Sequence, residues 1–99
     1  MCNESFEAVV TASKNVGFSR AGEQVVIKAH LPERTRDVQA CKFDTLQASY
    51  NGELSIRHEH GTVVIERTIV ACTAKTVLNA KRSLAGRIRS HLDIDAVTQ

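Results

Sequence analysis

Apolar and polar residues alternate along two segments in the first third of the chain, 6–12 and 24–31. A period of two is typical of strands that bury one face, so each segment is predicted to form a strand. The intervening residues 13–23 are too numerous for a tight hairpin turn and predict a loop. In that loop, Phe18 and Arg20 would present an aromatic ring and a cation to a binding partner.

Residues 33–43 leave two interpretations open, a helix or a loop followed by a strand from Val38, and we adopt the second. Asn51-Gly52 then separates two segments of strand character, 45–50 and 53–58. Asn-Gly between such segments is a strong hairpin signal, because both residues accept the positive φ that tight turns require. A three-residue loop would keep the apolar residues of both segments on one face of this hairpin.

A second hairpin is predicted around His60-Gly61. A two-residue loop at this position pairs Ile56 with Ile65 and so keeps the apolar residues of both strands on one face. The strand after the turn is predicted to run over 62–71.

Apolar residues recur with helical spacing over 74–92, and Thr73 is suited to cap the start of this helix. Residues 93–99 are predicted to form a tail. Together these elements predict an α+β fold in a single domain, 1–99. It would be a mostly antiparallel sheet of about five strands, with one C-terminal amphipathic helix packed across one face.

Composition excludes several classes without naming a function. The 99 residues are 42 % hydrophobic and 24 % charged, which is typical of a folded domain rather than a disordered chain. No apolar stretch approaches the roughly 20 residues that span a bilayer, so no membrane partner is expected. Three widely spaced cysteines favour a reducing, cytoplasmic location over a disulfide framework.

Residues with catalytic or metal-binding chemistry do not form a recognisable set. Cys41 and Cys72 lie among apolar neighbours and are predicted to be core residues rather than reactive thiols. His58 and His60 are two apart, but His60 is predicted to lie in the turn, so the two imidazoles would not share a strand face. We therefore expect a non-catalytic protein without a metal or cofactor.

Two cations interrupt apolar series. Arg67 stands in the inward-facing series of the last predicted strand, and Lys81 stands in the middle of the apolar stripe of the helix. Two cations at similar depth need an acid or a bound anion between them, which makes Arg67 and Lys81 a candidate anion-binding notch. The alternative is a bulge that turns Arg67 outward and a Lys81 side chain that extends to solvent.

The remaining candidates are two surfaces. Lys75, Arg82 and Arg89 recur every seven residues and would form a basic ridge along the helix, able to contact the phosphates of RNA or DNA. Apolar residues also stand at outward positions of the strands, on a face that one helix cannot cover. These candidates for an association face are Val9, Val26, Val64 and Val70.

The sequence therefore predicts a small binding module that acts through protein–protein contacts, with self-association into a homodimer through the open face of the sheet. Nucleic-acid binding through the basic ridge is the alternative. A formal net charge of +2 does not by itself indicate a polyanionic partner.

Overall fold

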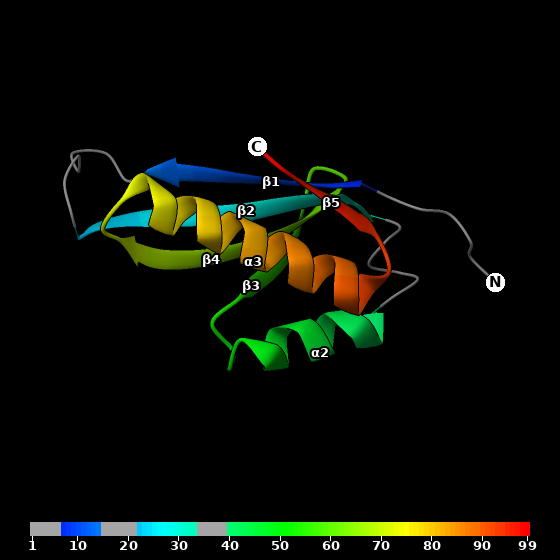
Figure 1. Ribbon diagram of the computed structural model, residues 1–99. Helices are drawn as coiled ribbons and strands as arrows, with labels where there is room; N and C mark the ends of the chain where they lie inside the picture. Colours follow the sequence, from blue (N-terminus) through cyan, green and yellow to red (C-terminus); the bar gives the residue numbers. More distant parts are fainter. Residues whose placement is uncertain (1–6, 15–21, 34–39) are drawn as a thin grey trace.

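A computed structural model describes residues 7–14, 22–33 and 40–99 of the chain. It shows an α+β arrangement in which five strands form one sheet and two helices pack against it (Figure 1). The elements in chain order are β1 (Glu7–Lys14), β2 (Glu23–Pro32), α2 (Ala40–Ser49), β3 (Ser55–Glu59), β4 (Thr62–Ala71), α3 (Ala74–Leu92) and β5 (Asp95–Thr98).

The sheet is mixed rather than purely antiparallel. Its strand order is β3-β4-β2-β1-β5, and only the contact between β1 and β5 is parallel. At its centre β2 and β4 pair along their whole lengths, from Glu23 opposite Ala71 to Pro32 opposite Thr62. The flanking strands are shorter, so the sheet is widest around the turn that joins β3 to β4 and narrower at the opposite end.

The alternating segments near the N-terminus form strands as predicted. β1 and β2 pair antiparallel, with Val10 opposite Ala29 and Ala12 opposite Ile27. Their inward-facing residues are almost completely buried, because alternation places every second side chain beneath the helices. Phe18 and Arg20 lie outside the described residues.

The second predicted hairpin is confirmed in its register. Ile56 lies opposite Ile65, and the turn residues His60 and Gly61 have φ values of 50° and 77°. Two successive positive φ values characterise the two-residue turn whose twist matches that of the strands. β4 has the predicted bounds, whereas β3 covers 55–59 rather than 53–58.

The predicted strand over 45–50 and its hairpin are wrong, because Ala40–Ser49 form the helix α2. The Asn-Gly pair ends this helix instead of turning a hairpin. Asn51 has φ 56°, its N–H donates to the carbonyl of Ala48 at 3.0 Å, and the N–H of Gly52 donates to the carbonyl of Gln47 at 3.2 Å. These two bonds are the Schellman arrangement, which satisfies carbonyls left open at a helix end.

The C-terminal helix is confirmed, and the predicted tail is corrected. α3 begins after Thr73, whose side chain accepts a hydrogen bond from the N–H of Thr76 at 3.1 Å. Asp93, at φ 54°, ends the helix in the left-handed region. The chain then continues as β5, because Ile94 and Ala96 alternate with exposed residues and bury their side chains beside β1.

One core joins both helices to one face of the sheet. It includes Leu46 from α2, Ile27 and Ile65 from the central strands, and Leu84 and Ile88 from α3, each 0–1 % exposed. Both described helices thus lie on one side of the sheet, and no described helix covers the opposite face (Figure 1).

Candidate functional site

All four valines predicted for association lie on the sheet face opposite the helices. The neighbours of each along its strand, such as Ala8 and Val10 beside Val9, belong to the core, so alternation directs the valines the other way. Val70 is 63 % exposed. Val9 and Val26 are partly buried, and Val64 is 1 % exposed although it lies outside the helix-covered core.

The structure adds a fifth valine to this face. Val97 on β5 lies opposite Val9 and is 39 % exposed. Sequence reasoning missed it because residues 93–99 were assigned to a tail. We call these five residues the valine face: Val9, Val26, Val64, Val70 and Val97.

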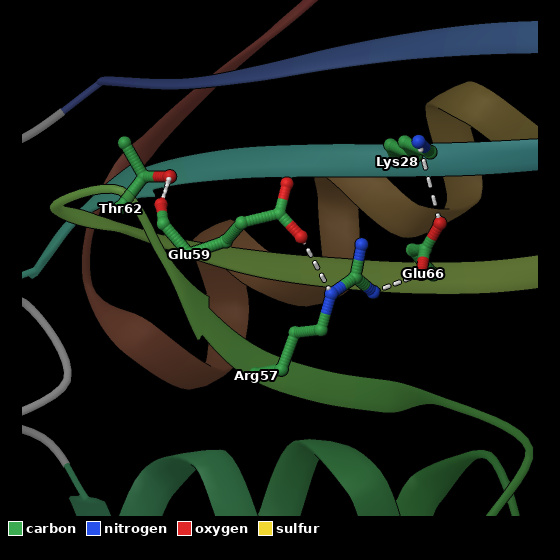
Figure 2. A network of polar contacts seen from close by, with 5 residues as sticks. All are labelled: Lys28, Arg57, Glu59, Thr62 and Glu66. Atoms are coloured by element: carbon green, nitrogen blue, oxygen red, sulfur yellow. Dashed lines mark hydrogen bonds and ion pairs between the residues drawn. The ribbon is translucent and has the colours of Figure 1, made fainter.

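A network of charged side chains joins β2, β3 and β4 (Figure 2). Lys28 and Glu66 are two residues from Val26 and Val64 along their strands, so these two side chains lie on the same face as the valines. Arg57 on β3 donates from Nη1 to Glu66 on β4, and from Nε to Oε2 of Glu59 at 3.0 Å. Lys28 on β2 approaches the second oxygen of Glu66 at 3.5 Å. The hydroxyl of Thr62 donates to the backbone carbonyl of Glu59 at 2.7 Å, beside the turn.

This network stabilises the charged forms of Glu66 and Arg57. The hydrogen bond from Arg57 lowers the pKa of Glu66 below its ordinary value, and the nearby charges of Arg57 and Lys28 act in the same direction. The same contact raises the pKa of Arg57. Because two cations face two carboxylates, the network is neutral as a unit and gives a polyanion little to bind.

The candidate notch at Arg67 takes a different form from the one predicted. The pairing of β2 with β4 is continuous, with Arg67 opposite Ile27, so no bulge turns Arg67 outward. Its Nη2 lies 3.6 Å from Oε2 of Glu53, and its guanidinium carbon lies 4.8 Å from the centroid of the Tyr50 ring. Lys81 is partly buried and has no hydrogen bond or ion pair within the described ranges.

A second arginine takes the place that Lys81 was expected to hold. The guanidinium carbon of Arg87 on α3 lies 4.5 Å from the centroid of the same Tyr50 ring. Its Nη1 also donates to the carbonyl of Ser49 at 3.2 Å, at the end of α2. Sequence reasoning missed Tyr50, Glu53 and Arg87 as a group because it placed Tyr50 in a hairpin.

The basic ridge is only partly free. Lys75 and Arg82 are exposed and make no ion pair with any residue in 7–14, 22–33 or 40–99. Arg89 donates from Nη2 to the carbonyl of Ala96 at 3.2 Å, so it holds β5 rather than facing solvent alone. This role depends on β5, which the sequence did not predict.

The described histidines and cysteines are not brought together at a metal site. Nδ1 of His58 lies 3.0 Å from Oε1 of Glu33, while His60 occupies the turn as predicted. Among the described residues, no group of three His, Cys, Asp or Glu side chains is placed to hold a metal ion. Cys41 and Cys72 are exposed, which corrects their assignment to the core: Cys41 lies in the first turn of α2, and Cys72 lies just before α3.

A shallow, open depression of about 290 Å³ lies where α2 faces β3. Its lining residues are Ala40, Phe43, Asp44, Gln47 and Ile56. Gln47 is committed to structure, since its side-chain amide donates to the carbonyl of Leu54 at 3.1 Å. The depression therefore offers one free carboxylate, on Asp44, and lacks the convergent polar groups of an enclosed ligand site.

Comparisons with protein-family models, with curated proteins and with solved structures find no match to this chain. Its function is therefore inferred from its own residues. The longest helix of the described part, α3, has 19 residues and carries five basic side chains. No described helix combines the length and the apolar character needed to cross a membrane.

Proposed function

We propose that the protein is a non-catalytic binding module that associates with a protein partner, in the first instance a second copy of itself, through the valine face. The observation that carries this proposal is the exposure of Val70, which is 63 % on a sheet face without a covering helix. Val97 on the same face is 39 % exposed, and Val9 and Val26 are partly exposed, so four of the five valines offer apolar surface to a partner.

The edge of β4 supports the same surface. β3 pairs only with residues 62–66 of β4, so residues 67–71 have β2 on one side and no described strand on the other. In the β3–β4 hairpin, Thr62 and Glu59 form the hydrogen-bonded pair next to the turn. Every second residue of β4 after Thr62 therefore directs its N–H and C=O groups toward the β3 side of the strand. Thr68 and Val70 therefore direct their N–H and C=O groups to the open side, where an added strand can bind them.

Charge also favours a protein partner. The network of Lys28, Arg57, Glu59 and Glu66 is balanced, so it adds no repulsion when two copies of this face approach. The exposed, unpaired thiols of Cys41 and Cys72 fit a reducing compartment, and we place the protein in the cytoplasm on that ground.

Light scattering coupled to size-exclusion chromatography tests the proposal. The wild type is expected to elute with the mass of a dimer, and Val70→Glu is expected to elute as a monomer, because a carboxylate would be buried unpaired in the interface. Asn79→Glu is the matched control, since it adds the same charge at an exposed position of α3. A monomeric wild type, or equal dissociation by both variants, contradicts the proposal.

Nucleic-acid binding through α3 remains the alternative proposal. The helix has five basic residues and no acidic residue, and Lys75 and Arg82 are exposed. If these side chains contact phosphates, the affinity for a labelled duplex falls steeply with salt, and each of Lys75→Gln and Arg82→Gln lowers the salt slope by about one unit. Val70→Glu leaves that binding unchanged, which separates the two proposals.

A further inference from the structure

Two arginines meet one tyrosine where the end of α2 approaches β4 and α3. The guanidinium carbons of Arg67 and Arg87 lie 4.8 and 4.5 Å from the centroid of the Tyr50 ring. Tyr50 is 5 % exposed and belongs to the core, so the two cations lie against a buried ring. Cation–π contact favours this placement but supplies no opposite charge.

Two hydrogen-bond donors in this cluster are left without an acceptor. The hydroxyl of Tyr50 and Nε of Arg67 are buried and make no hydrogen bond to any described residue. Buried donors are normally satisfied, because an unmade hydrogen bond retains the whole penalty of removing the group from water. An acceptor supplied from outside the chain would remove that penalty at both atoms.

The Glu53 carboxylate lies near Arg67 but is too far away to form a hydrogen bond with it. Oε2 of Glu53 lies 3.6 Å from Nη2 of Arg67, which is longer than a hydrogen bond, and the Glu53 side chain is 56 % exposed. Nε and Nη2 form one edge of the guanidinium group, and an oxyanion can accept from both at once. Glu53 therefore approaches Nη2 of this edge and leaves Nε without an acceptor among the described residues.

The charges of the cluster do not balance. Arg67 and Arg87 contribute two permanent cations, and Glu53 contributes one anion. The carbonyl of Ser49, at the negative end of α2, offsets part of the charge of Arg87. The excess of positive charge next to unpaired donors is what a bound anion would neutralise.

We propose that Tyr50, Arg67 and Arg87 form a binding site for an oxyanion, a phosphate or carboxylate group. The oxyanion accepts hydrogen bonds from Nε and Nη2 of Arg67 and from the Tyr50 hydroxyl, and it displaces the Glu53 carboxylate. Arg87 on α3, which contacts the same ring, contributes a second positive charge. This site lies on the helix side of the sheet and does not depend on the valine face.

Nuclear magnetic resonance of the arginine side chains tests the site. The Nε–H signal of Arg67 is followed while inorganic phosphate or acetate replaces chloride at constant ionic strength. A saturable shift with both anions assigns the site to oxyanions in general, and a shift with phosphate alone assigns it to phosphate groups. No saturable shift with either anion overturns the proposal.

Three variants separate this site from unspecific attraction to a basic protein. Arg67→Lys keeps the charge but removes the two-donor edge, and it is expected to abolish saturable binding, which is followed in this variant by the Nε–H signal of Arg87 on the same ring. Glu53→Gln removes the competing carboxylate and is expected to tighten binding about two- to five-fold, the range for an exposed ion pair. Lys42→Gln, which removes a charge from the start of α2, where Lys42 pairs with Asp93, is expected to leave the affinity unchanged. Weaker binding by Glu53→Gln, or equal losses in Arg67→Lys and Lys42→Gln, overturns the proposal.

Discussion

Leu46 provides the sharpest test of how α2 is attached to the sheet. A helix of ten residues is marginal in water by itself, so α2 depends on the side chains that it buries. Leu46 is 0 % exposed and belongs to the core beneath β2 and β4. Replacing it with alanine removes buried methyl groups and leaves a cavity, which costs about 3 kcal/mol for a fully buried leucine.

The effect is large compared with the stability of the whole domain. A chain of this size is expected to have about 5–15 kcal/mol of unfolding free energy. With a urea m-value of about 1.5 kcal/mol/M, Leu46→Ala lowers the unfolding midpoint by about 2 M. Circular dichroism during urea titration measures this shift, and the variant is expected to remain folded in buffer.

Thr45→Ala is the matched control for Leu46→Ala. Thr45 is exposed on the same helix, and within the described part of the chain its hydroxyl donates to the carbonyl of Cys41 in the preceding turn and to no other group. Its replacement is expected to change stability by no more than about 0.5 kcal/mol. A loss below about 1 kcal/mol in Leu46→Ala, comparable with that of an exposed residue, would refute the packing of α2 on the sheet.

Three further predictions concern stability. Glu66→Gln is expected to unfold more readily than the wild type at neutral pH, because the uncharged side chain loses its ion pair with Arg57. Since the pKa of Glu66 is lowered in the folded state, the difference in stability between the two proteins shrinks as the pH falls below the ordinary value of 4.5. Urea titrations at several pH values measure this difference. Thr73→Ala removes the acceptor for the N–H of Thr76 and is expected to cost about 1 kcal/mol by thermal or urea unfolding. Asn51→Gly suits the positive φ at the end of α2 and is expected to raise the unfolding midpoint slightly, whereas a lower midpoint would contradict the Schellman cap.

The pattern of neighbouring residues was sufficient to predict the elements whose apolar residues fit only one arrangement. The hairpin around His60 and Gly61 was predictable because only one loop length keeps the apolar residues of both strands on one side. The helix after Thr73 was predictable because its apolar stripe and its cap agree. In both cases neighbouring residues carry all the information that is needed.

The Asn-Gly pair shows where such reasoning failed. Positive φ at Asn51 and Gly52 serves a hairpin turn and a helix end equally well, so the dipeptide does not distinguish them. Phe43, Leu46 and Tyr50 have helical spacing, but three residues are a weak pattern beside a strong turn signal. β5 was missed because four residues gain stability only from pairing with a strand at the other end of the chain.

The candidate sites could be predicted only where the elements that carry them were predicted. The valine face follows from strand alternation, so four of its five members were predictable. The contact between Lys28 and Glu66 could have been found by placing the two strands in register, because the residues lie directly opposite each other. The Tyr50 cluster could not be found, since it requires α2 to end beside β4 and α3.

The parallel pair of β1 and β5 joins the first described strand to the last. Ala8 lies opposite Ala96, so the chain must be synthesised through β5 before this pair can form. Closing so long a loop is slow compared with forming the hairpin of β3 and β4. During synthesis, β1 therefore has one unpaired edge until β5 is made, and Arg89, which donates to the carbonyl of Ala96, holds the strand that pairs with this edge. A chain that ends before β5 is therefore expected to leave one edge of β1 unpaired and available to strands of other chains.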